Sequence, residues 1–73
     1  MNFLSKKVLE FNEKKLSEAK KNLEYNISKK EQLEKLPTSE NVKQEIEKIE
    51  KLIKIWEKNV EKIKKEIKKI QER

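Results

Sequence analysis

The stretch KIEKLIKIWEKNVEKIKKEIKKI, residues 48–70, has the most regular spacing of apolar residues in this chain. From residue 42 onward, apolar side chains recur at alternating intervals of four and three residues without a break. This period of 3.5 residues is typical of a helix that packs a narrow apolar seam against another helix. The seam residues are Val42, Ile46, Ile49, Ile53, Trp56, Val60, Ile63, Ile67 and Ile70.

The first half of the chain carries the same repeat in a weaker form. We label the seven positions of the repeat a to g and place Ile46 at a. On this labelling, positions a and d of the first half are filled by Leu9, Asn12, Leu16, Ala19, Leu23, Asn26, Lys30 and Leu33. Polar residues in such a seam commonly fix the register of the two helices at a cost in stability.

The two halves are separated by KLPTSEN, residues 35–41, which holds the single proline. Pro37 disfavours helical geometry at Leu36, and either Thr38 or Ser39 can cap the helix that follows. We therefore predict an all-α fold with one domain over residues 1–73: a two-helix antiparallel coiled-coil hairpin. Its helices are expected at about 3–35 and 39–72, with a turn at 36–39, and two such hairpins could dimerise into a four-helix bundle.

In an antiparallel pair, a positions of one helix pack against d positions of the other, which leaves two plausible registers. The numbers of two facing residues sum to 79 in the first register and to 72 in the second. The first register sets opposite charges against each other, and we predict it for that reason. Its expected ion pairs are Glu34 with Lys43, Lys20 with Glu57, Glu13 with Lys64 and Lys15 with Glu66. The second register would instead oppose Glu13 to Glu57 and Lys6 to Lys64.

Composition argues against catalysis. The chain has 73 residues and no Cys, His or Gly, so thiolate zinc sites, the usual near-neutral base and glycine-rich phosphate loops are all missing. We expect no enzymatic activity, no cofactor or metal, and no small-molecule substrate. No apolar run approaches the roughly 18 residues of a membrane span and no signal peptide is evident, so we expect a cytoplasmic protein.

Six apolar residues lie outside the seam, at positions c and g. Because g faces g in an antiparallel hairpin, they fall on one side of the molecule. We call this set the apolar flank: Leu4, Val8, Phe11, Tyr25, Leu52 and Ile55. It is either an interface with a second copy or a partner protein, or a set of ordinary surface hydrophobic residues.

The net charge of +6 offers an alternative. Lysines at positions c and f of the second half could follow a phosphate backbone without sequence specificity: Lys48, Lys51, Lys58, Lys62, Lys65 and Lys69. Arg73 is the sole arginine, and glutamates interleave with the lysines, which favours a solvated surface. A Lys-rich amphipathic helix can also lie on a lipid surface, although a strict 3.5-residue period favours a protein seam.

The sequence thus predicts a small non-enzymatic protein–protein interaction module, an adaptor or an inhibitor-like accessory protein that acts through the apolar flank. A short chain rich in Lys, Ile and Asn would suit an accessory protein of a mobile element. Non-sequence-specific nucleic-acid binding through the lysines is the alternative function.

Overall fold

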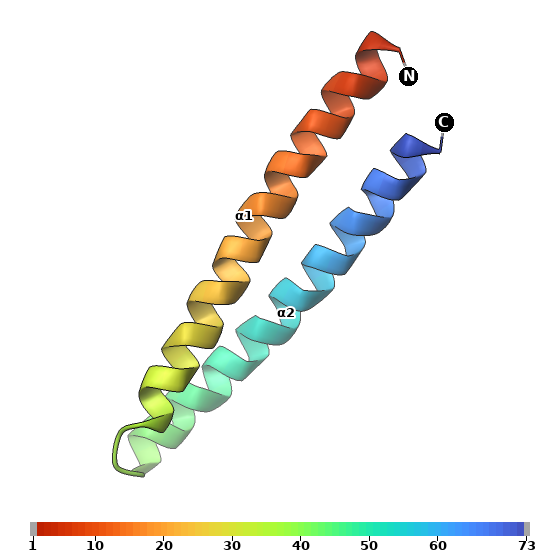
Figure 1. The fold of residues 1–73 in the computed structure, drawn as a ribbon. Coiled ribbons are helices and arrows are strands. Elements are labelled where there is room, and N and C mark those ends of the chain that lie inside the picture. The colour runs from red at the N-terminus through yellow and green to blue at the C-terminus, as the bar shows by residue number, and fades with distance from the viewer. Residues whose placement is uncertain (1, 73) are drawn as a thin grey trace.

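The structure is a computed structural model, and it describes residues 2–72. Helix α1 spans Phe3–Glu34 and helix α2 spans Glu40–Gln71, and the two run antiparallel with both chain ends at the same end of the hairpin (Figure 1). This confirms the predicted all-α helical hairpin. The predicted helix boundaries lie within about one residue of the observed ones.

Each helix begins at a side-chain cap. The Oδ1 atom of Asn2 accepts a hydrogen bond from the Ser5 N–H at 2.8 Å, and the Oγ atom of Ser39 accepts one from the Val42 N–H at 3.2 Å. Each cap satisfies one of the backbone donors that the first turn of a helix leaves without a partner. Of the two candidates in the turn, Ser39 is therefore the cap rather than Thr38.

Helix α1 ends without the left-handed residue that commonly closes a helix. The Lys35 N–H donates to the Gln32 carbonyl and the Leu36 N–H to the Leu33 carbonyl, which tightens the last turn. No residue described in the structure has a positive φ angle. A chain without glycine can therefore make this turn with ordinary backbone geometry.

Burial follows the predicted seam in both helices. Within residues 2–72, the buried side chains are Ala19, Asn26, Ile49, Val60 and Ile70. The other predicted seam residues are half-buried, and Ser5 extends the seam toward the N-terminus. Away from the seam, every residue of this range except Asn59 is exposed. The core is therefore a single line of contact that two helices cannot fully cover.

The ion pair between the helices identifies the register. The Lys30 Nζ atom lies 3.5 Å from the Glu50 Oε1 atom, and these residue numbers sum to 80, close to the predicted 79. In the register with a sum of 72, Lys30 would face position 42, eight residues or about 12 Å along the helix axis from Glu50. The pair therefore agrees with the predicted register and excludes the alternative.

The individual ion pairs predicted from that register are wrong. None of the four lies within 4.0 Å among residues 2–72, where Lys30 and Glu50 form the pair between helices instead. Two of the expected partners bind along α2: Lys64 lies 3.8 Å from Glu61, and Glu66 lies 3.7 Å from Lys69. Long exposed side chains choose among several partners of similar energy, so register does not fix their pairing.

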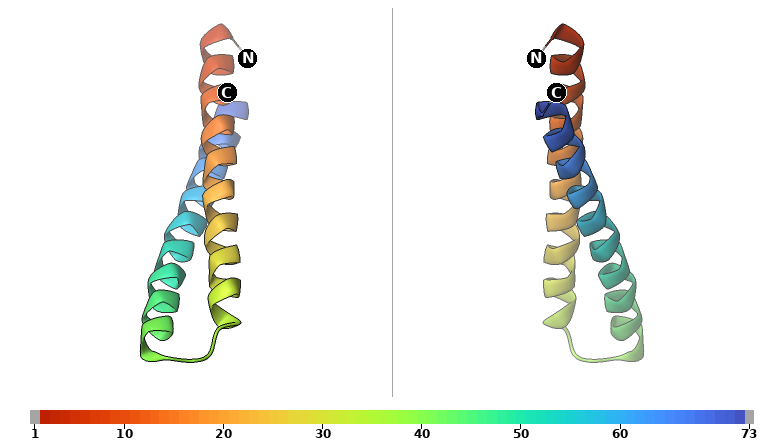
Figure 2. Two further views of the ribbon diagram at one scale, coloured as in Figure 1. Left: turned by 90° about the vertical axis from the view of Figure 1, so that its left-hand side faces the viewer. Right: turned by 90° about the vertical axis from the view of Figure 1, so that its right-hand side faces the viewer.

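The hairpin is narrow, with principal extents of 55 × 14 × 12 Å. The two helices are inclined to each other: they diverge toward the termini in Figure 1 and toward the turn in the rotated views of Figure 2. A small inclination of this kind lets side chains of one helix pack between those of the other. Within the described part of the chain, neither helix has an apolar stretch long enough to cross a bilayer.

Candidate interaction surface

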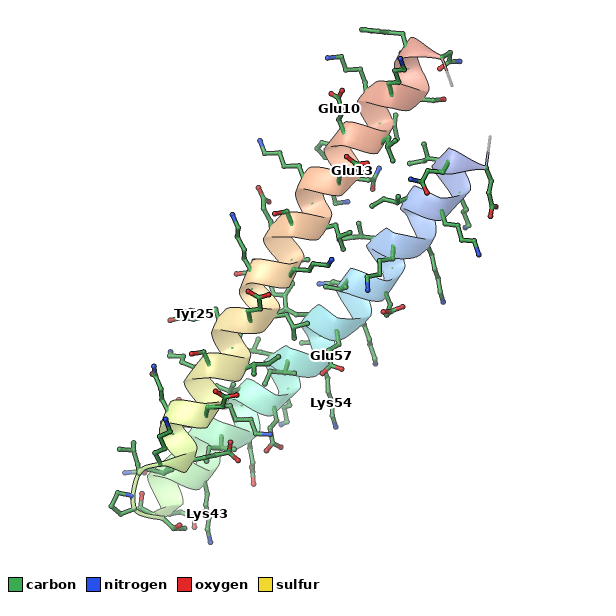
Figure 3. All side chains as sticks on the ribbon, in the orientation of Figure 1. Glu10, Glu13, Tyr25, Lys43, Lys54 and Glu57 are labelled. Atoms are coloured by element: carbon green, nitrogen blue, oxygen red, sulfur yellow. The ribbon has the colours of Figure 1, made fainter. Side chains whose placement is uncertain are left out.

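The seam divides the rest of the hairpin into two broad sides. Positions c and g of both helices form one side, which we call the c/g side, and positions b and e form the other, the b/e side. Figure 3 labels five residues of the b/e side, Glu10 and Glu13 on α1 with Lys43, Lys54 and Glu57 on α2. Side chains at f point outward along the two edges.

Exposed apolar side chains gather on the c/g side. All six residues of the apolar flank are exposed, from 43% for Val8 and Leu52 to 71% for Leu4. Leu36, at position g beside the turn, lies on the same side and was not predicted. Phe3 and Ile27 are the exposed large apolar residues of the b/e side. Seven of the nine exposed large apolar residues of the described range therefore lie on the c/g side.

The apolar flank separates into two clusters along the hairpin. Residues of α1 and α2 whose numbers sum to about 80 lie at the same level, as the Lys30–Glu50 pair shows. Tyr25 is therefore level with Ile55 and one turn from Leu52. The second cluster, made of Leu4, Val8 and Phe11, lies near the termini, about 20 Å away along α1 at 1.5 Å per residue.

A groove of about 390 Å³ lies between the two clusters on the c/g side. It exists because Ala19, buried at position d, leaves space beside the much larger Trp56. Its lining comes from positions c, d and g of both helices: Asn12, Lys15, Glu18, Ala19, Asn22, Trp56, Asn59, Lys62, Ile63 and Glu66. This groove was not predicted from the sequence, although the small residue at position 19 was the signal for it.

The seam asparagines of α1 satisfy themselves locally. Their Nδ2 atoms donate to backbone carbonyls one turn earlier, Asn12 to Val8 at 2.9 Å and Asn26 to Asn22 at 2.8 Å. Asn22, at position g in the groove, donates in the same way to Glu18 at 3.1 Å. Among the described residues, no buried side-chain nitrogen or oxygen lacks a partner. Burying these amides therefore carries no uncompensated polar cost.

Each exposed aromatic residue of α1 has a lysine four residues later. The Nζ atoms of Lys15 and Lys29 lie 5.5 and 5.6 Å from the ring centroids of Phe11 and Tyr25. At this distance the cation is attracted to the ring, and the lysine stem covers part of it. These aromatic residues therefore offer an apolar ring beside a positive charge.

The lysines of α2 proposed for nucleic-acid contact do not form one uninterrupted surface. Lys48 and Lys69 bind Glu45 and Glu66 at 3.5 and 3.7 Å, and both lie at c on the c/g side with Lys62. Lys51, Lys58 and Lys65 follow the outer edge at f. Glu57 and Glu61 border the same shallow surface as Lys58, Lys62 and Lys65. Carboxylates thus interrupt the positive charge along the helix.

The two broad sides also differ in charge. The b/e side carries ten glutamates and six lysines, although the whole chain is basic. The glutamates are Glu10, Glu13, Glu24, Glu31, Glu34, Glu40, Glu47, Glu50, Glu57 and Glu61, and the lysines are Lys6, Lys20, Lys43, Lys54, Lys64 and Lys68. Because charged residues are mostly found exposed to solvent, we expect the b/e side to remain in contact with water.

The chain matches no known protein family, no curated protein and no solved structure. The surface that differs most from an ordinary solvated helix face is the c/g side, with its two apolar clusters and the groove between them.

Proposed function

We propose that this chain is a non-enzymatic protein–protein interaction module, of the adaptor or inhibitor-like kind, that binds through the c/g side of its hairpin. One observation carries the proposal: among residues 2–72, seven of the nine exposed large apolar residues lie on this side. Apolar residues scattered at random would divide between the two broad sides and the edges. Contiguous exposed apolar surface bordered by polar residues marks protein interfaces.

The incomplete core supports the same proposal. Trp56 and Ile63 belong to the seam, yet both line the groove and remain half-buried. A protein seated on the c/g side would remove them from water together with Tyr25, Leu52 and Ile55. Aromatic residues at the centre of such a surface commonly contribute much of the binding energy.

The test is a pull-down from lysate of the source organism at two salt concentrations, with and without nuclease. The wild-type chain is expected to retain a protein partner after nuclease treatment, and the variant L52K/I55K is expected to lose it. F3K/I27K is the matched control, because it places two lysines at exposed apolar positions of the b/e side. Retention of the partner by L52K/I55K would contradict the proposal.

Nucleic-acid binding is the second candidate. It is favoured by Lys51, Lys58 and Lys65, which follow the outer edge of α2 one heptad apart, about 10.5 Å, and make no ion pair within 4.0 Å among the described residues. In the same pull-down, loss of all binding on nuclease treatment would support this candidate and contradict the first.

A further inference from the structure

We propose that the partner on the c/g side is a second copy of this chain, joined about a two-fold axis that runs parallel to the long axis of the hairpin. Both turns then lie at the same end of a four-helix bundle, and α1 of each copy lies over α2 of the other at the same level. This inference rests on the proposed function, since it names the occupant of the same surface.

Charge complementarity carries the choice of a second copy. Lys15 is level with Glu66, and Glu18 is level with Lys62, and all four line the groove. In the proposed dimer each of these residues faces the oppositely charged one of the second copy. Lys15, Glu18 and Lys62 make no ion pair within the described part of their own chain, so these three charges are available to a partner.

Several uncharged residues of the same surface also match, although Leu4 has no counterpart at its level because α2 of the second copy ends at Gln71. Tyr25 comes to lie over Ile55 of the second copy, and Asn22 over Asn59. An amide can both donate and accept hydrogen bonds, so two facing asparagines can satisfy each other. Phe11 comes level with Lys69 of the second copy, an aromatic ring beside a cation. No level of the proposed interface opposes two like charges.

The reversed orientation, with the two turns at opposite ends, does not match as well. In that orientation α1 packs on α1 of the second copy and α2 packs on α2. One axial shift between the two copies places Lys15 opposite Glu18 of the second copy, but Leu52 then lies beyond the end of the other α2. The offset that lays one apolar cluster on the other brings Glu18 against Glu18 of the second copy. Each offset therefore loses either apolar cover or charge matching.

The surface is large enough for a stable dimer. Specific interfaces bury about 800 Å² of each partner, and the hairpin exposes 6065 Å² in total. The interface therefore requires about one eighth of the exposed surface of the hairpin. The dimer would leave the glutamate-rich b/e sides on the outside of the bundle.

Charge reversal in the full chain tests both the occupant and the orientation. By sedimentation equilibrium the wild-type chain is expected to dimerise, and E18K and K62E are each expected to weaken self-association about tenfold, because each symmetric dimer contains the altered contact twice. Mixing E18K with 15N-labelled K62E restores both contacts. Native mass spectrometry should then show heterodimer in preference to either homodimer.

The control pair is E24K and K54E, which reverses two charges at a matching level on the b/e side and should dimerise like wild type. Circular dichroism should show every variant as helical as wild type, since all four positions are exposed. Three results would each overturn the inference: a wild-type chain that stays monomeric into the millimolar range, single variants that dimerise normally, or a mixture without preferred heterodimer. A monomeric chain whose L52K/I55K variant loses a nuclease-resistant partner would overturn self-association alone and leave the proposed function standing.

Discussion

Individual polar residues in the seam show how a narrow helix pair fixes its alignment. Lys30 occupies a seam position with its side chain 32% exposed, and it reaches Glu50 on the other helix. Four residues earlier, the buried Asn26 turns its amide to the backbone of its own helix. The Lys30 contact therefore favours one alignment of the two helices. The Asn26 hydrogen bond lies within α1 and does not depend on the alignment.

A double-mutant cycle measures the Lys30–Glu50 interaction. We expect an attractive coupling of about 0.2 to 1 kcal/mol between Lys30→Ala and Glu50→Ala, the range for partly exposed pairs, from urea denaturation. The cycle on Lys20 and Glu57 is the control, because these opposed residues do not approach within 4.0 Å in the described structure, and its coupling should be close to zero. Equal coupling in both cycles would mean that general charge, rather than this contact, stabilises the hairpin.

Replacing Asn26 by leucine should stabilise the hairpin. Asn26 is 8% exposed, and its side-chain N–H donates to the carbonyl of Asn22 in its own helix. The substitution therefore replaces this locally hydrogen-bonded amide with apolar surface in contact with the facing helix. We expect a gain of about 1 kcal/mol or more in the free energy of unfolding. Loss of stability in urea denaturation would show that Asn26 makes a contact that this structure does not contain. Asn22→Leu, at an exposed position, should change stability much less.

Single residues also mark the limit of sequence-based prediction. The seam could be predicted because position d and position a residues must face the other helix whenever the repeat is unbroken. The ion pairs could not, because Lys64 and Glu66 each have partners along α2 as good as those across the interface. The exposure of the apolar flank followed from its heptad positions, but the groove depended on the volume of Ala19 beside Trp56.

At the scale of helices, the two elements contribute unequally. Helix α2 has an apolar residue at every seam position, whereas α1 interrupts its seam with Asn12, Asn26 and Lys30. Helix α2 also has a capping serine, an acidic Glu40 in its first turn and lysines in its last turn, all of which suit the helix dipole. The boundaries near residue 39 were predictable to within one residue, because two adjacent hydroxyl side chains compete for the cap.

The cap of α2 gives a test at this scale. Ser39→Ala removes the oxygen that accepts the Val42 N–H, and we expect it to cost about 0.5 to 2 kcal/mol in the free energy of unfolding. Thr38→Ala is the matched control, since the cap is Ser39, and should change stability by only a few tenths of a kcal/mol. Thermal or urea denaturation followed by circular dichroism measures both. A larger loss of stability for T38A than for S39A would contradict this prediction, because it would show that Thr38 rather than Ser39 caps α2.

For the whole molecule, the central fact is that a hairpin 55 Å long has a core one seam wide. Most seam residues keep part of their surface in water, and the c/g side adds exposed apolar residues next to them. Small domains that cannot bury enough surface alone often gain stability by oligomerisation. Stability of this chain should therefore rise with its concentration if the proposed dimer forms.

Trp56 reports on this association without any label, because it is the only tryptophan and it lines the groove. As the concentration rises from micromolar to millimolar, its emission maximum should move to shorter wavelength and its quenching by acrylamide should decrease, since the second copy excludes water from the groove. E18K should shift this transition to higher concentration, and E24K should not. Unchanged emission while the mass doubles would place the interface away from the c/g side.

The most deeply buried side chain of residues 2–72 is Ile70, which is 1% exposed and lies in the last turn of α2, at the end of the hairpin opposite the turn. The turn joins the helices covalently at one end. Contacts at the other end close almost the whole chain into a loop, so they lose the most conformational entropy on forming. In folding, pairing should therefore start beside the turn and reach Ile70 last. Anchoring at that site works against fraying of the termini, so the helix ends near residues 5 and 70 should resist amide hydrogen exchange better than chain ends ordinarily do.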